Sequence, residues 1–346
     1  MFKKVFAAIF FISFILSIPS NSAQAILTVG PTSITSDSTL SIQGVPLSST
    51  GTQNVFVGKD AGSVMTSGNQ NTFVGYEAGV ANTGGVINTF LGYHAGNANT
   101  NGNTNTFLGA YSGENITTGS DNVFVGLSAG RFIGTGLYNT CVGNYACNGN
   151  SGSQTGSQNS AVGWQALFLN TSGQNNEAFG LYAGYANTTG SDNVSIGVQA
   201  NYSTGAGGKN VAIGTLANSS GAGTGNIAIG WQAANNVVTG SNNITIGYNI
   251  NAPAGAGSNQ LSIGNLIYGT GLNGTGATPS TGNVGIGTAT PTEKFDVNSD
   301  TIRIRTAKTP ASAAATCDQG EIVWDASFVY VCTATNTWKR AAIATW

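Results

Sequence analysis

The chain has 346 residues, of which 11 are basic and 13 acidic, and its formal net charge is −2. A charge this close to neutral gives no electrostatic reason for a nucleic-acid partner, and we expect none. The 51 glycines follow no Gly-X-Y period, which excludes collagen, and 40% apolar residues are enough for a core, which argues against a disordered linker.

Residues 1–25 have the pattern of an export signal peptide. Lys3 and Lys4 supply a positive start, the run from Val5 to Ile18 is apolar, and the letters SAQA, ending at Ala25, fit a cleavage site. A transmembrane anchor is the alternative reading, but the apolar run is short for a bilayer. We therefore expect a secreted, extracellular or cell-surface protein with no membrane-spanning segment after signal removal.

Residues 26–50 are strand-like, and we expect them to cap the repeats that follow. From 51 to 268 the chain repeats the unit N-x-x-[aliphatic or Phe]-G-x-x-A-x, whose positions we number 1 to 9. The glycine at position 5 recurs every 17 residues, with one interval of 20 and one of 16. A second glycine stands three residues before position 1. The position-5 glycines are Gly58, Gly75, Gly92, Gly109, Gly126, Gly143, Gly163, Gly180, Gly197, Gly214, Gly230, Gly247 and Gly264.

This repeat predicts an all-β fold. The units are rich in Gly, Asn, Thr and β-branched residues, and their apolar runs are too short for helices. A short, constant period is typical of stacked repeats, and each fixed glycine marks a corner that needs positive φ or close backbone approach. We predict a parallel β-roll or β-solenoid of about 13 rungs, with two short strands per rung stacked about 4.8 Å apart.

Side chains alternate along a strand, so positions 2 and 4 share one face and position 3 takes the other. Position 4 is never polar, from Val57 to Ile263, and we predict that it forms the inner core. A stripe of five phenylalanines at position 3 would then be left outside, and such stripes usually mark interfaces. We therefore predict a homotrimer joined through this stripe, with the face of positions 2 and 4 as the alternative. The stripe consists of Phe56, Phe73, Phe90, Phe107 and Phe124.

Two further positions are nearly constant. Position 1 is Asn in 12 rungs and Gln260 in the last, which predicts a ladder of stacked amides; a sugar-binding ladder is the alternative. Position 8 is mostly Ala, which predicts a tight inward corner. In one rung, positions 3 and 9 change together to Cys141 and Cys147, which predicts a disulfide across the corner. Free thiols or a bridge between chains are the alternatives.

The stretch NVAIGTLANSSGAGTGNIAIGWQAA, from Asn210 to Ala234, resembles the repeats in the heads of trimeric autotransporter adhesins. The resemblance covers about 54–264 and implies a left-handed parallel β-roll, three chains and an adhesive function. The longer period of this chain implies extra residues in one loop. Within the transition segment 269–311, GNVGIGTATPTEKFDV is similar to a segment of phage tail fibres and bacterial surface fibres, where it leads into a new strand, here TIRIRT.

Residues 312–346 predict a small antiparallel module with strands around Glu321–Asp325, Phe328–Thr333 and Thr337–Ile343. Cys317 and Cys332 are expected to form its disulfide, since a small exported domain needs one. The aromatic residues of the module predict either a glycan-binding site or simply its core. They are Trp324, Tyr330 and Trp338.

Catalytic and cofactor motifs are absent from the sequence. His94 is the only histidine, the carboxylates are scattered, and neither a phosphate-binding loop nor a calcium-binding repeat occurs. We expect no enzyme, no metal and no cofactor. The predicted function is an extracellular, adhesin-like rod that displays a small terminal module. The alternatives are a subunit of a filament polymerised end to end and a phage-type receptor-binding tail fibre.

Overall fold

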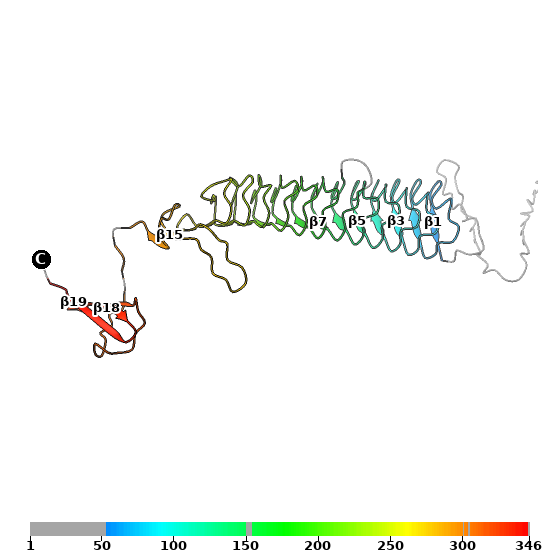
Figure 1. Cartoon of the computed structure of the whole chain (residues 1–346). Coiled ribbons are helices and arrows are strands. Elements are labelled where there is room, and N and C mark those ends of the chain that lie inside the picture. The colour runs from blue at the N-terminus through cyan, green and yellow to red at the C-terminus, as the bar shows by residue number, and fades with distance from the viewer. Residues whose placement is uncertain (1–52, 150–153, 300, 304, 345–346) are drawn as a thin grey trace, which may run out of the picture. The chain divides into compact units, whose positions relative to one another are not determined.

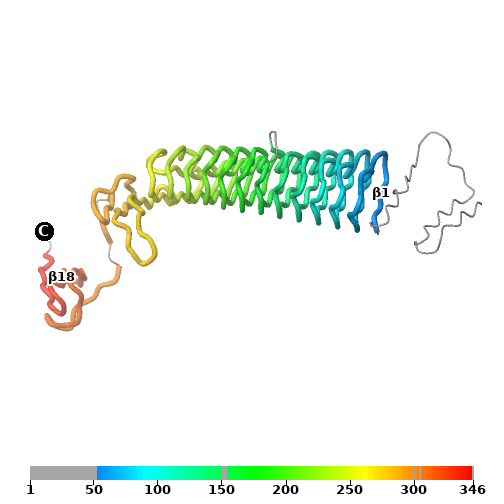
Figure 2. Tube along the Cα trace, turned by 45° about the vertical axis from the view of Figure 1, so that its right-hand side comes forward, coloured from blue at the N-terminus to red at the C-terminus, as the bar shows by residue number. Residues whose placement is uncertain are grey.

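The computed structural model describes residues 53–149, 154–299, 301–303 and 305–344. The expected signal peptide and the segment 26–50 lie outside these residues. The described part is all-β, as predicted: a parallel solenoid of about twelve turns, and a separate three-stranded antiparallel sheet near the C-terminus. Figure 1 shows the solenoid strands stacked in a row, and Figure 2 shows the turns of the backbone repeating along the rod.

Within the described residues, thirteen strands of three residues pair in parallel, each with the next. We call the turn that contains strand βn rung n. The strands are β1 (Val55–Val57), β2 (Thr72–Val74), β3 (Thr89–Leu91), β4 (Thr106–Leu108), β5 (Val123–Val125), β6 (Thr140–Val142), β7 (Ser160–Val162), β8 (Glu177–Phe179), β9 (Val194–Ile196), β10 (Val211–Ile213), β11 (Ile227–Ile229), β12 (Ile244–Ile246) and β13 (Leu261–Ile263).

Each rung holds one strand, at positions 2 to 4, so the expectation of two strands per rung was wrong. The rest of the rung is a series of turns, in which the residue before position 1 and the residue at position 7 have positive φ. In rung 2 these residues are Gln70, with φ of 57°, and Glu77, with φ of 53°. Corners of this kind reverse the chain within one or two residues, which leaves no room for a second strand.

The two fixed positions of each rung require glycine for different physical reasons. Gly75, at position 5, has φ of +142°, and an added Cβ atom there would lie 2.2 Å from the carbonyl oxygen of Gly92 in the next rung. Gly85 belongs to the second set and has no positive φ. An added Cβ atom at Gly85 would still lie 2.5 Å from the carbonyl oxygen of Gly102. The rungs therefore approach too closely at both corners for any side chain.

The core lies on the opposite face of the strand from the one predicted. Position 3 points inward: four of the five phenylalanines have no exposed surface, and Phe56 is 6% exposed. Their rings stack from rung to rung with centroids 4.6–5.0 Å apart. The predicted inner core at position 4 points outward instead. The phenylalanine stripe is thus buried within its own chain, and its assignment as a subunit interface was wrong.

The interior is filled by matched residues at positions 3 and 9, which face each other inside the rung. Where position 3 is Phe, position 9 is Gly: a Cβ atom at Gly96 would lie 2.5 Å from the ring of Phe90. Where position 3 is Ser195, position 9 is Asn201, whose Nδ2 donates to the serine hydroxyl at 2.8 Å. In rung 6 the same two positions are Cys141 and Cys147, and they form a disulfide within the chain.

The asparagines at position 1 form the predicted amide ladder. The Oδ1 atom of Asn71 accepts a hydrogen bond from the backbone N–H of Asn88 at 2.9 Å, and its Nδ2 donates to the carbonyl oxygen of Gly85 at 2.8 Å. The side chain is fully buried. The same two bonds recur along the rod, for example at Asn176 and Asn193. The structural interpretation of position 1 is therefore confirmed.

The parallel stacking ends at β13. Strand β14 (Ile267–Gly269) runs antiparallel to β13, and β15 (Val284–Ile286) and β16 (Phe295–Val297) continue the same sheet. The GNVGIGT segment supplies β15. The strand expected at TIRIRT was wrong, since the described residues of 301–306 form none.

The terminal module has its three strands close to the predicted places: β17 (Ile322–Trp324), β18 (Phe328–Ala334) and β19 (Thr337–Ala342). Their order is β17-β18-β19, and both pairs are antiparallel. The predicted disulfide between Cys317 and Cys332 is present and is buried with Tyr330 and Trp338.

Candidate functional site

The outer face of the solenoid carries a continuous row of aliphatic and aromatic side chains at position 4, which we call the outer strip. Seven of its members are 37–42% exposed, although all are large and apolar. Because each strand pairs in register with the next, these side chains lie directly above one another along the rod. The exposed members are Leu91, Leu108, Val162, Phe179, Ile196, Ile213 and Ile229.

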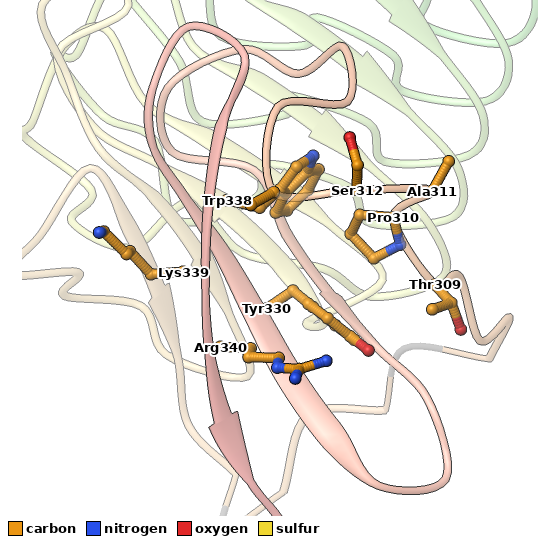
Figure 3. A pocket seen from close by; sticks show the side chains of 9 residues that line it. Thr309, Pro310, Ala311, Ser312, Tyr330, Trp338, Lys339 and Arg340 are labelled. Atoms are coloured by element: carbon orange, nitrogen blue, oxygen red, sulfur yellow. The ribbon is translucent and has the colours of Figure 1, made fainter.

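The terminal module contains a cleft of about 470 Å³. Tyr330 and Trp338 form its floor, and each is only 5% exposed. Thr309, Ser312 and Arg340 are more exposed and stand around it, as Figure 3 shows. The backbone of Trp338 donates to the carbonyl oxygen of Ala313 at 2.8 Å, which holds the segment before the disulfide against the sheet.

Asp325 accepts hydrogen bonds from two residues that line the cleft. The hydroxyl of Tyr330 donates to its carboxylate at 2.6 Å, the backbone N–H of Ser327 at 2.8 Å, and the hydroxyl of Thr309 at 2.9 Å. These hydrogen bonds, that of Tyr330 first, lower the pKa of Asp325 to about 2. The same bond to Asp325 raises the pKa of Tyr330. Asp325 therefore positions Tyr330 as a charged acceptor.

The three predicted ligand residues do not share one site. Tyr330 and Trp338 line the same cleft, but Trp324 lies in a separate cleft of about 380 Å³ with Ile322 and Val329. The strand register explains the separation, because Trp324 pairs with Val329 and its side chain falls on the other face of the sheet from Tyr330. In Figure 3 the side chain of Lys339 also points away from Tyr330.

The solenoid carries an ionic cluster that was not predicted from the sequence. The Nε2 atom of His94 lies 3.2 Å from the carboxylate of Glu77, and its Nδ1 atom lies 3.4 Å from that of Glu114, which also pairs with Arg131. Glu77 and Glu114 are far apart in the sequence, so they do not stand out there as a carboxylate pair. The signal that could have found the cluster is their place in the repeat, at positions 7 and 10 of neighbouring rungs.

Among residues 53–149, 154–299, 301–303 and 305–344, no three or more His, Cys, Asp or Glu side chains are grouped so that they could hold a metal ion. The same part of the chain has no helix with the length and apolar character needed to cross a membrane.

The fold defines the chain as an all-β solenoid protein, and comparison with known proteins adds one partial similarity. No family model and no solved structure matches. A stretch of 41 residues, 12% of this chain, is 49% identical to a protein of Klebsiella phage K5-2 described as depolymerase 1, capsule K30/K69-specific. That stretch amounts to 5% of the phage protein's length.

Proposed function

We propose that the chain is the exported subunit of an adhesive extracellular fibre, in which three copies of the solenoid associate through the outer strip. The observation that carries the proposal is the exposure of large apolar side chains in register along the rod. Soluble monomers rarely leave a contiguous apolar surface of this extent in water, and such surfaces mark interaction sites. Two further copies of the same chain supply an identical, equally regular strip to cover it.

Assembly can be tested by charging the outer strip. We expect the double variant Leu108→Asp and Ile213→Asp to be a folded monomer, because a carboxylate at a subunit contact leaves an unpaired charge there. Native mass spectrometry reports the oligomeric state, and circular dichroism reports folding. Ser172→Asp, at an exposed polar corner away from the strands, is the matched control and should stay trimeric. A wild-type chain that is monomeric and soluble would refute the assembly.

For the terminal module we propose glycan binding in the cleft of Tyr330 and Trp338. Its apolar floor and few polar groups, from Thr309, Ser312 and Arg340, fit the usual composition of ligand sites. The similarity to a protein described as capsule-specific supports a saccharide as the ligand class. A glycan array probed with wild type and Thr309→Ala/Ser312→Ala tests this proposal. Equal binding by both proteins would exclude the cleft as the site.

A second candidate function is cleavage of a polysaccharide. It is favoured by the similarity to a protein described as a depolymerase and by the two carboxylates that flank His94. Two carboxyl groups can act as acid and base in glycoside hydrolysis. Release of reducing ends from polysaccharides by wild type, and its loss in Glu77→Gln and Glu114→Gln, would establish this activity. Absence of any release would dismiss it.

Electron microscopy of the purified protein distinguishes the remaining alternatives. An adhesin-like rod gives isolated particles of one length, whereas a filament subunit that joins end to end gives continuous fibres. A phage-type tail fibre would bind to cells through the terminal module without being exported by the cell that makes it. Cell fractionation therefore separates this last alternative from the first two.

A further inference from the structure

Rungs 7 to 9 carry an aromatic surface that neither the fold nor the assembly uses. At position 10 of these rungs, Phe168, Tyr185 and Tyr202 stack in a column, with ring centroids 5.3 and 5.0 Å apart. At position 7 of rung 8, Tyr182 meets Tyr185 and Tyr202 edge-on, at 5.4 and 6.0 Å. We call these four residues the aromatic edge. All four are partly exposed.

The amides beside the aromatic edge complete its chemistry. Gln165 and Gln199 occupy position 7 in rungs 7 and 9, directly before and after Tyr182, and both are partly exposed. Positions 7 and 10 of these three rungs hold no charged residue. The surface therefore offers ring faces and edges, hydroxyls and amides, but no ionic group. This composition suits a ligand that is uncharged and rich in hydroxyl groups.

The solenoid does not require aromatic residues at these positions. Position 10 is Asn97 in rung 3 and Asn235 in rung 11, in the same fold. Position 7 has a left-handed backbone, which favours Gly or Asn over Tyr: Tyr182 has φ of 57°, and Asn249 has φ of 51° at the same position of rung 12. Tyr182 thus stands where the backbone prefers asparagine, and it points away from the core. We conclude that packing of the rung does not select it.

We propose that the aromatic edge binds a neutral polysaccharide chain that runs along the rod. Successive rungs repeat at about 4.8 Å, so the edge offers equivalent groups at regular intervals to a polymer of equivalent sugar units. The aromatic rings contact the apolar faces of the sugars, and the hydroxyls and amides bond their hydroxyl groups. The site depends neither on the outer strip nor on the cleft of the terminal module.

The test is affinity electrophoresis of the full chain in gels that contain dextran, laminarin, mannan or galactan, with alginate, hyaluronan and collagen as comparators. The variant Tyr182→Asn/Tyr185→Asn/Tyr202→Asn places at each position a residue that other rungs already carry there. We expect it to bind at least one neutral polysaccharide about tenfold more weakly than wild type does. Circular dichroism checks that the triple variant is folded. If the triple variant is not folded, the single variant Tyr185→Asn is used in its place.

Tyr138→Asn is the matched control. Tyr138 is 59% exposed and has φ of 59°, but it precedes its strand and lies outside the aromatic edge. We expect this control to bind the neutral polysaccharide as wild type does. The proposal is overturned if wild type binds no neutral polysaccharide, if the tyrosine variant binds undiminished, or if these tyrosines bind only the acidic polymers or collagen.

Discussion

The first five rungs and rungs 9 to 12 have the same backbone register but different interiors. In the first set, stacked phenylalanine rings fill position 3. In the second set, position 3 is Ser195, Ala212, Ala228 or Thr245, and each of these is as fully buried as the rings are. The strand pairing does not change between the two sets. Core volume therefore does not determine the path of the chain.

What the two regions share is the set of contacts that stack the rungs. Both have the amide ladder at position 1, and both have glycines where neighbouring backbones nearly touch. The interior adjusts to this frame through position 9, which is Gly beside each Phe and larger in rungs 9 to 12, as at Asn201 and Ala234. The adjustment is incomplete near the end of the rod, where the buried hydroxyls of Thr245 and Ser262 have no hydrogen-bond partner. We infer that the phenylalanine rungs contribute more stability than the later ones.

The largest expected effect comes from making a phenylalanine rung resemble a later one. Phe90→Ala should lower the free energy of unfolding by about 3–5 kcal/mol, because it removes a ring stacked on both sides. Guanidinium unfolding measures the change. The double variant Phe90→Ala/Gly96→Leu copies rung 7, where Ala161 and Leu167 occupy positions 3 and 9, and should recover part of the loss. A loss below about 1 kcal/mol for Phe90→Ala would contradict the core assignment.

The amide ladder should matter in both regions alike. Asn105→Ala removes the acceptor of the Asn122 backbone N–H and the donor to the carbonyl oxygen of Gly119. Leaving both groups buried without a partner should cost about 3 kcal/mol. Asn226→Ala, in rung 11, is the matched variant, since it loses the corresponding bonds to Asn243 and Gly240. Unequal losses of unfolding free energy in the two variants would show that the contribution of the ladder depends on the volume of the core beside it.

The disulfide of rung 6 directly follows the five phenylalanine rungs. Reducing it should cost about 2 kcal/mol, because the closed loop is short. Cys141→Phe/Cys147→Gly turns rung 6 into a phenylalanine rung, and its new ring would extend the stack above Phe124. We expect this variant to keep the fold and most of the stability without a disulfide. Unfolding of the variant in mild denaturant would show that the bond is needed to join the regions.

Much of this architecture could be predicted from the sequence. The constant glycines and asparagines reflect backbone contacts, and those contacts recur along most of the solenoid. The paired change at Cys141 and Cys147 predicted a contact between positions 3 and 9, which the structure contains. The pairing of Phe at position 3 with Gly at position 9, as in Phe90 and Gly96, is the pattern in the sequence that places position 3 inside the rung.

Apolar character alone could not show which side chains of a strand face the core and which face solvent. A strand of three residues contains one inward side chain, so alternation has too few positions to show a pattern. Leu91 and Leu108 at position 4 are as apolar as any core residue, yet they are exposed. The cluster around His94 was not predicted because it depends on which corner of the rung carries each side chain. The separation of Trp324 from Tyr330 was not predicted because it depends on the strand register of the terminal module.

The smallest expected effect is a difference between the terminal module and the solenoid in how their stability depends on pH. The folded module holds the pKa of Asp325 at about 2, below the ordinary value of 3.8. A lowered pKa gives stability that is complete above the ordinary value and is lost as the pH falls through the lowered one. The module should therefore lose stability between about pH 4 and pH 2. Strands β10 to β12 and the turns between them contain no Asp, Glu or His, so this part of the solenoid should be less affected.

Hydrogen–deuterium exchange at several pH values, read peptide by peptide and corrected for the intrinsic rate, can follow the two regions in one sample. Peptides from strands β17 to β19 should lose protection as the solution is acidified, whereas those from β10 to β12 should keep it. Asp325→Asn is the matched control, since an amide oxygen can still accept from Tyr330 but does not titrate. Its module should show a flatter dependence on pH. If wild type and Asp325→Asn lose protection over the same pH range, the bond between Tyr330 and Asp325 does not control the acid stability of the module.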